Sequence, residues 1–239
     1  MNKYEITKRI ENFAPLETSE KWDASGWIVD NPNCNNVSKI MLCLTPTKST
    51  IQQAKTQNCD ILISHHPMFC VDVDLVSKDF HPDINIYCAH TNMDKANGGT
   101  TDTIIKTLGL EKYKQKINHE FLRFVAFPNG ISVSDFSKKI AKISPNARIV
   151  NNNNLKTLHS IAFCAGSGTE FIQEAQELGA DCLVTGDLKF HTALDSEIVV
   201  YDIGHFESEI LILPVFERII GKDVEIIFAN ETSPFSPII

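Results

Sequence analysis

Two adjacent histidines, His65 and His66, follow a short apolar run that ends at Ser64 and stand directly before Pro67. Neighbouring side chains in a strand point to opposite faces, so the two imidazoles could not share a partner within a strand. Beyond the strand end, in a loop stiffened by Pro67, both rings can turn to one side and suit a pair of metal ions about 3.5–4 Å apart. The alternative is a strand end with one buried, hydrogen-bonded histidine and one solvated histidine.

A histidine and a glutamate four residues apart, His205 and Glu209, follow a second apolar run near the C-terminus. In a helix this spacing puts both side chains on one face, one turn apart, as a chelating pair requires. Glu207 would point elsewhere, and we expect it to complement the dipole at the helix N-terminus instead.

His90 and Asp94 have the same spacing and also follow a short apolar run. Asp94 can supply a second carboxylate, and either Asp94 or Glu209 could bridge two ions. We expect His90 to orient Asp94 or an imidazole from behind, with direct ligation as the alternative. Mixed imidazole–carboxylate sites suit zinc, iron(II), manganese or cobalt and do not select among them. Because none of the candidate ligands in these pairs is a cysteine, we expect an open site with bound water and not a closed structural zinc site.

Short apolar strands alternate with helical patterns along much of the chain. We expect strands at residues 40–44, 59–64, 84–89, 121–127, 160–165, 181–185, 198–202 and 224–229, and helices at 3–14, 47–56, 99–108, 134–142, 169–178 and 205–219. This order predicts parallel sheets with helices on their faces. In such sheets the functional crevice lies beyond the carboxyl ends of the strands, where all three pairs of candidate ligands fall. We expect the two tryptophans of the loop at 20–27 to anchor it to the core, with binding of a ligand as the alternative.

An internal repeat aligns residues 40–69 with residues 161–190 without a gap. Each copy has the pattern strand, tight turn, helix and strand, and the turn of the second copy is the Gly-Ser-Gly segment 166–168. With a small change of register, His90 and Asp94 then align with His205 and Glu209. We therefore expect an α/β protein with two similar lobes and the metal site in the cleft between them. The first lobe would comprise residues 1–115 plus about 200–239, and the second about 116–199.

The composition is that of an ordinary soluble globular chain. It has 239 residues, 43% of them hydrophobic, and a formal charge of −8 that is spread without a basic cluster. This charge gives little support to binding of nucleic acid or of an anionic membrane. The seven cysteines are odd in number and include no C-x-x-C pair, so we expect reduced core thiols. With no signal peptide at the N-terminus and no apolar run of membrane-spanning length, we expect a cytoplasmic protein.

Taken together, the motifs resemble those of the Nif-three-like family, whose members are commonly labelled GTP cyclohydrolase I type 2 homologues. The resemblance covers nearly the whole chain and is carried by Trp22-Asp23, Ile63-Ser64-His65-His66-Pro67, Ala89-His90-Thr91-Asn92-Met93-Asp94, Thr185-Gly186-Asp187-Leu188-Lys189, and Asp202-Ile203-Gly204-His205 with Glu209. It implies a two-lobed α/β protein that binds two divalent metals and assembles as a toroidal homohexamer, with the metals facing the central cavity. The ligands that it implies are His65, His66, Asp94, His205 and Glu209.

The chain departs from the family's pattern in two loops. Residues 22–27 replace the more usual Trp-Asp-Asn-x-Gly-Leu, and residues 45–47 follow Cys43-Leu44, where relatives often have an aspartate ahead of the threonine. Both departures concern the outer pocket, and so the substrate, and leave the implied ligands unchanged. The chain is also too short for the extra middle domain of longer relatives.

The resemblance implies a metal-dependent hydrolase, in which a metal-bound hydroxide opens the imidazole ring of GTP and releases formate. The sequence itself supports the metal half of this reaction. It has no G-x-x-x-x-G-K-[ST] loop, and none of its four arginines lies in a motif, although a triphosphate site usually presents such groups. Lys95, Lys189 or the glycine turn 166–168 could meet an anion, but we expect the turn to be a strand-to-helix connection.

We therefore expect a dinuclear metal-dependent hydrolase of a small, nucleotide-like substrate. A regulatory, chaperone-like or scaffold hexamer that binds metal without turnover is the alternative. A separate general acid or base would favour the enzyme, and Asp187 and His191 are the candidates for it, with a capping or core position as the other interpretation.

Overall fold

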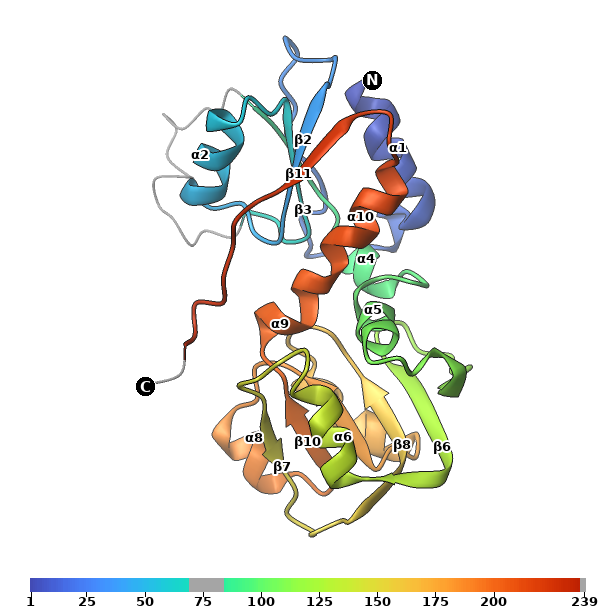
Figure 1. The fold of residues 1–239 in the computed structure, drawn as a ribbon. Helices are drawn as coiled ribbons and strands as arrows, with labels where there is room; N and C mark the ends of the chain where they lie inside the picture. The colour runs from blue at the N-terminus through green and yellow to red at the C-terminus, as the bar shows by residue number, and fades with distance from the viewer. Residues whose placement is uncertain (69–83, 237–239) are drawn as a thin grey trace. The chain divides into compact units, whose positions relative to one another are not determined.

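Two β-sheets, each with its own helices and core, organise the chain. The computed structural model describes residues 1–68 and 84–236 (Figure 1). Unit 1 comprises Met1–Gly99 and Ile212–Thr232, and unit 2 comprises Thr100–Leu211 and Ser233–Ile239. Residue 69, the last position of the first repeat copy, lies outside the described residues.

Unit 1 contains a five-stranded sheet in the order β1-β4-β3-β2-β11. Its strands are β1 (Gly26–Val29), β2 (Lys39–Cys43), β3 (Ile61–Ser64), β4 (Asn85–Cys88) and β11 (Glu225–Phe228). The last four of these run parallel, and β1 pairs antiparallel with β4 at the edge. The carboxyl ends of β2, β3 and β4 therefore lie at one edge of the sheet, where the sequence places His65, His66 and His90.

Helices cover both faces of the unit 1 sheet. They are α1 (Lys3–Phe13), η1 (Leu16–Thr18), α2 (Lys48–Thr56), α4 (Thr91–Lys95) and α10 (Leu213–Ile220). Figure 1 shows α2 on one face, and α1 beside α10 on the other. The helix α2 begins at a capping box, in which the side chains of Thr47 and Thr50 each accept a hydrogen bond from the other residue's backbone N–H.

Unit 2 contains a six-stranded sheet in the order β5-β6-β8-β9-β10-β7. Its strands are β5 (Lys114–Gln115), β6 (Arg123–Ser132), β7 (Arg148–Val150), β8 (Thr157–Phe163), β9 (Cys182–Thr185) and β10 (Val199–Asp202). The central strands β8, β9 and β10 are parallel, whereas β5, β6 and β7 join antiparallel at the edges. The central strands of both sheets are therefore parallel, as expected, and strands whose antiparallel direction the sequence did not indicate join at the edges.

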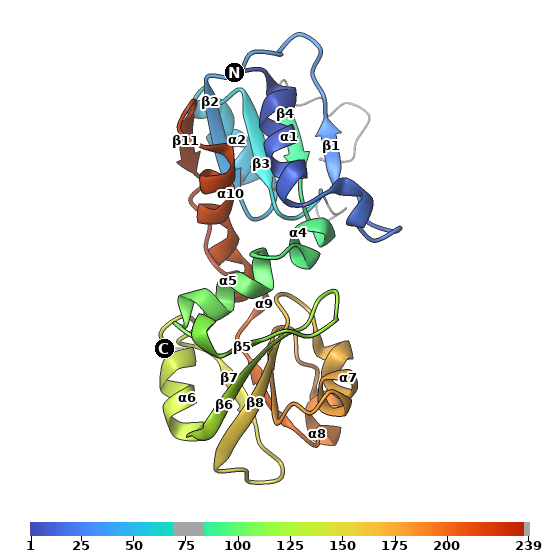
Figure 2. The same ribbon diagram turned by 90° about the vertical axis from the view of Figure 1, so that its right-hand side faces the viewer.

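The helices of unit 2 pack on both faces of its sheet. They are α5 (Thr100–Thr107), η2 (Glu111–Tyr113), α6 (Val133–Ile140), η3 (Thr169–Phe171), α7 (Ile172–Glu177), α8 (Phe190–Asp195) and α9 (His205–Glu209), followed by η4 (Ile210–Ile212). Figure 2 shows α6 on one face, and α7 and α8 on the other. Each face has its own core cluster: Phe136 of α6 lies in one, and Ile172 of α7 lies in the other.

The cores are made of apolar strand residues and buried thiols. Met41, Leu62 and Ile86 of neighbouring strands meet in the unit 1 core, because parallel strands with helices on both faces are buried on both sides. The six described cysteines are free thiols, and burial raises the pKa of Cys43 and Cys182 well above its ordinary value. Among the described helices, none has the length and apolar character needed to cross a membrane.

Most expected strands and helices are confirmed, but two long segments differ. The predicted helix at 205–219 is divided into α9, η4 and α10, and Pro214 lies in the first turn of α10. Proline has no N–H to donate, so it suits the start of a new helix better than the middle of a long one. Strand β6 continues to Ser132, past the expected end at residue 127, and its pairing with β8 shifts register between Ala126 and Ile131.

The division into units differs from the expected lobes 1–115 plus 200–239 and 116–199. Residues 100–115 and 200–211 belong to unit 2. Strand β10 pairs with β9, and Ile104 of α5 lies in a unit 2 core cluster, which explains both assignments. The candidate ligands His65, His66, His90 and Asp94 therefore belong to unit 1, and His205 and Glu209 belong to unit 2.

Replacing Leu183 by alanine should lower the free energy of unfolding by about 2–5 kcal/mol, because it leaves a cavity in the unit 2 core. Leu194→Ala in the same unit is the matched control: its side chain is 63% exposed, so we expect a change within about 0.5 kcal/mol. Urea denaturation measures both. Equal losses in the two variants would contradict this description of the core.

Candidate metal centre

Strand β3 ends at Ser64, and the backbone of the next two residues remains fixed to the neighbouring strand end. The amide of His65 donates to the carbonyl of Cys43 (3.3 Å), and the amide of His66 donates to the carbonyl of Leu44 (2.8 Å). The Ser64 hydroxyl donates to the carbonyl of His66 at 2.7 Å. The two histidines are thus held at the sheet edge as the sequence predicted.

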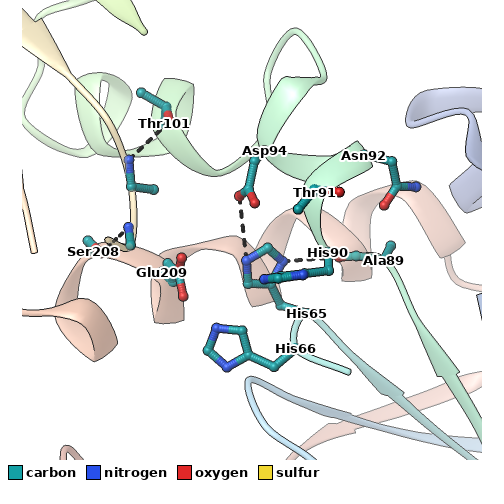
Figure 3. Close-up of polar contacts among 12 residues, drawn as sticks. His65, His66, Ala89, His90, Thr91, Asn92, Asp94, Thr101, Ser208 and Glu209 are labelled. Atoms are coloured by element: carbon teal, nitrogen blue, oxygen red, sulfur yellow. Dashed lines mark hydrogen bonds and ion pairs between the residues drawn. The ribbon is translucent and has the colours of Figure 1, made fainter. Parts of the chain in front are cut away.

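Three imidazole rings of unit 1 form one group (Figure 3). The ring centroid of His65 lies 5.1 Å from that of His66 and 5.2 Å from that of His90, and the last two are 5.5 Å apart. One nitrogen from each ring lies within 4.8 Å of the others, a spacing that could hold a metal ion. His90, which we expected behind the ligands, therefore packs directly with the other two rings.

The Nδ1 atoms of His65 and His66 both contact a neighbouring oxygen. His65 Nδ1 lies 3.0 Å from the carbonyl oxygen of Ala89, and His66 Nδ1 lies 2.8 Å from the hydroxyl of Thr45. A carbonyl oxygen can only accept, so this contact places a proton on Nδ1 of His65. In the neutral ring Nε2 then carries the lone pair, which is the form that binds a metal.

Thr45 is itself fixed by an acidic residue from the C-terminal part of unit 1. The carboxylate of Glu231 accepts from the amides of Leu44 (2.6 Å) and Thr45 (3.1 Å). No sequence pattern indicates this link, since Glu231 lies in no motif and 186 positions separate it from Thr45.

His90 is oriented by Asp23, whose side chain is fully buried. Asp23 Oδ1 lies 2.9 Å from His90 Nδ1, and Oδ2 accepts from the Thr91 amide (3.0 Å), the Thr91 hydroxyl (2.6 Å) and the Ser25 hydroxyl (2.7 Å). Burial opposes ionisation of Asp23, but the hydrogen bonds from His90, Thr91 and Ser25 outweigh it and hold the pKa of this carboxyl well below its ordinary value. The Trp-Asp motif thus supports the histidine group.

Asp94 lies in the short helix α4 and faces the histidine group (Figure 3). Its Oδ1 is 3.5 Å from His65 Nε2. With the proton of His65 on Nδ1, a lone pair and a carboxylate oxygen face each other, which is a favourable arrangement around a shared cation. The α4 segment is anchored by Asn92, whose side-chain amide Nδ2 donates to the carbonyl of Ala14 at 2.7 Å.

In unit 2, His205 and Glu209 pair across one turn of α9, as their spacing predicted. His205 Nε2 lies 3.0 Å from Glu209 Oε2, and His205 Nδ1 lies 2.7 Å from Asp187 Oδ2. Burial disfavours the charged imidazole, but Glu209 and then Asp187 outweigh this effect and raise the pKa of His205 to about 10. Without a metal ion the ring therefore carries a proton at neutral pH, and an ion that binds Nε2 must displace it.

The glycine turn 166–168 is a packing element beside Glu209. The amide of Gly166 donates to the Ser208 hydroxyl (2.9 Å), and that of Gly168 donates to the Thr185 hydroxyl (2.9 Å). A Cβ atom on Gly166 would come within 2.2 Å of Glu209 Oε1. Since both glycine amides already donate to side chains, the turn matches the strand-to-helix connection that we preferred over an anion site.

The remaining candidates lie as follows. Asp187 holds His205 and adopts a left-handed backbone conformation (φ 58°). His191 is exposed on α8, with its ring edge-on to Phe190 at 5.3 Å. Glu207 lies in the first turn of α9, as expected. Lys95 forms an ion pair with Glu20 (2.7 Å), and Lys189 directly precedes α8.

The two tryptophans of the loop at 20–27 differ. Trp27 packs edge-on between Tyr4 (5.6 Å) and Tyr87 (5.2 Å), which confirms it as an anchor. Trp22 is 69% exposed, so the expectation that it anchors the loop was wrong. Its indole instead lies edge-on to the ring of His90, with the centroids 6.2 Å apart.

The fold and these residues define a class: a two-unit α/β protein whose histidines and carboxylates could bind a metal ion. The family model for Duf34/NIF3 (NGG1p interacting factor 3) matches residues 1–234. A GTP cyclohydrolase 1 type 2 homolog from Clostridium perfringens is 31% identical over 257 residues, covering 97% of this chain and 97% of that protein. A second GTP cyclohydrolase 1 type 2 homolog, from Clostridium acetobutylicum, is 30% identical and covers 84% of this chain and 82% of that protein. The chain belongs to the Duf34/NIF3 family.

Solved structures agree with this assignment. Reduced HcgD from Methanocaldococcus jannaschii matches with a TM-score of 0.82 at 26% identity, covering 97% of this chain and 98% of that one. A Bacillus cereus protein related to NIF3 matches with a TM-score of 0.84, covering 100% and 99%, and at 17% identity it supports the fold alone.

An NMR titration of the chelator-treated, metal-free protein should give a pKa of about 10 for His205. Because this folded-state value lies above the ordinary 6.5, the charged ring stabilises the fold fully below about pH 6.5, and the contribution is lost as the pH rises through about 10. Glu209→Gln should lower the pKa of His205 more than Asp187→Asn does. A value near 6.5 in the unchanged protein would contradict the pairing.

Proposed function

We propose that the chain binds two divalent transition-metal ions and uses them to hydrolyse a small, nucleotide-like substrate. One observation carries the metal half of this proposal. In each of the four histidines described above, Nδ1 contacts a neighbouring oxygen. The pairs are His65 with the Ala89 carbonyl, His66 with the Thr45 hydroxyl, His90 with the Asp23 carboxylate and His205 with the Asp187 carboxylate. Metal-binding imidazoles in proteins are usually held in this way from behind, so that Nε2 remains for the ion.

The proposed ligands come from both units and are those that the sequence predicted: His65, His66, Asp94, His205 and Glu209. Asp94 or Glu209 could contribute to both ions. His90 is a further imidazole beside those of His65 and His66. This set of nitrogen and carboxylate donors suits zinc, iron, manganese or cobalt.

The chain's own residues would prepare the centre for hydrolysis. Divalent ions at such a centre lower the pKa of bound water and polarise a substrate oxygen. Asp23 and Asp187 fix the rings of His90 and His205 and, as carboxylates, increase the basicity of these imidazoles. Asp187 thereby acts on His205, which is a different role from the general acid or base considered from the sequence.

GTP is the first substrate to test, because the relatives are named GTP cyclohydrolase 1 type 2 homologs. The arginines give it little support. Three of the four pair with carboxylates: Arg9 with Asp223, Arg123 with Asp102, and Arg148 with Asp202. This observation favours, as the second candidate, a metal-binding regulatory, chaperone-like or scaffold protein without turnover.

We further propose that the protein works in the cytoplasm as a toroidal homohexamer, as the family resemblance implies. Of the six described cysteines, all free thiols, five are buried, which agrees with a reducing compartment. Metal analysis of the purified, unchelated protein, with molar mass from light scattering of the same sample, tests site and assembly together. We expect about two transition-metal ions per chain in a hexamer. An assay for formate with GTP as the substrate then tests turnover, and we expect release of formate. A metal-free protein that also refuses added zinc, manganese or iron would exclude the hydrolase.

His66→Ala and Glu209→Ala should each sharply lower the metal content while leaving the far-UV circular dichroism nearly unchanged. The exposed His191 provides the matched control, and His191→Ala should retain the full content. Full occupancy in the first two variants would overturn the ligand assignment.

Thr45→Val should weaken metal binding about 10- to 100-fold, because it removes the hydroxyl that fixes His66 and leaves the backbone contacts to Glu231 in place. Thr45→Ser keeps the hydroxyl and should bind nearly as well as the unchanged protein. Isothermal titration with zinc measures both affinities, and equal values for the valine and serine variants would show that the hydroxyl does not matter.

A further inference from the structure

Trp22 is exposed although the loop that carries it is firmly held. On one side, the amide of Glu20 donates to the Thr91 hydroxyl at 2.9 Å. On the other side, the buried carboxylate of Asp23 accepts from His90 and Thr91 (2.6–3.0 Å). The segment that carries the indole is thus tied to the start of α4 by the backbone of Glu20 on one side and by the side chain of Asp23 on the other. The 69% exposure of Trp22 is therefore a fixed position of the ring and not a consequence of a loose loop.

The exposed indole lies next to the histidine group. Its ring is edge-on to His90, with the ring planes at 75° and the centroids 6.2 Å apart. The His90 ring in turn lies 5.2 Å from that of His65 and 5.5 Å from that of His66. A planar group stacked on the indole would therefore have the proposed metal ligands close to its edge.

The surroundings of Trp22 favour a small ring over a protein partner. The core of a protein–protein interface is an apolar cluster several residues wide. In the loop, Trp22 follows the exposed Lys21, and Glu20 forms an ion pair with Lys95 at 2.7 Å. A single aromatic ring among polar groups is the arrangement that stacks the bases of nucleotides, since every base has a π-face.

We propose that Trp22 is a stacking platform for the planar heterocyclic ring of the ligand that the metal centre takes. The inference rests on the proposed function and narrows it, because it defines the ligand class as a nucleobase-sized heterocycle joined to a metal-seeking group. In this role Trp22 is a binding residue that sets affinity for the ring, and it holds no metal.

Binding of GTP, ATP, UTP and ringless inorganic triphosphate to the metal-loaded protein tests the proposal by calorimetry. At least one nucleotide should bind more tightly than triphosphate. Trp22→Ala should weaken that nucleotide about 5- to 150-fold and leave triphosphate unchanged, as expected for loss of one base stack. Trp22→Phe should restore most of the affinity. Phe190→Ala is the control, because Phe190 is an exposed aromatic (74%) in unit 2.

Fluorescence provides a second readout, because the chain has two tryptophans and Trp27 packs against two tyrosines. The stacked base should quench the emission, and Trp22→Phe should abolish the quenching. The proposal is overturned if no nucleotide binds better than triphosphate, if Trp22→Ala binds the nucleotides unchanged, or if this variant has a different molar mass in light scattering, which would identify Trp22 as a subunit contact. A metal-free protein would overturn the proposed function first, whereas a metal-loaded one that fails these tests would overturn the stacking role alone.

Discussion

The contact at the Nδ1 atom of each histidine is the constraint on which the arrangement depends. An imidazole can turn about two bonds, and only an outer partner decides which nitrogen faces inward. In unit 1 these partners come from the ends of strands β2 and β4 and from the Asp23 loop, and in unit 2 from the turn after β9. Within each unit, parallel pairing places neighbouring strand ends side by side, so each sheet positions both the oxygens and the rings that they contact.

Local patterns in the sequence were sufficient for most of the strands and for the pairs of candidate ligands. Apolar runs marked β3, β9 and β10, and the four-residue spacing placed His205 and Glu209 on one face of a helix. The edge strands β1, β5 and β7 were missed. Strands β5 and β7 have only two and three residues and are mostly exposed, and β1 begins within the Gly-containing segment at 20–27 that we expected to be a loop. The apolar periodicity of residues 205–219 predicts one long helix, but a separate helix, α10, begins with Pro214 in its first turn.

The partners of the histidines were the least predictable part. Thr45 and Glu231 meet because β2 pairs in parallel with its neighbours β3 and β11. This is a long-range contact that no local sequence pattern predicts. The expected lobe boundaries differ from those of the two units for a similar reason. Residues 200–211 resemble the segment after β4 in sequence, but strand pairing with β9 assigns them to the other sheet. Which strand a segment joins is decided by the whole core, whereas a ligand pair is decided by its own spacing.

The close approach of Gly166 to Glu209 has a consequence for reading other sequences of this kind. Position 166 carries no donor atom, yet a side chain there and the present place of the glutamate carboxylate exclude each other. A relative could thus retain every histidine and acid of the set and still have lost its geometry through one small residue at the turn. Inventories of metal-binding residues that count only donors would miss such a loss, and this glycine should be inspected together with them.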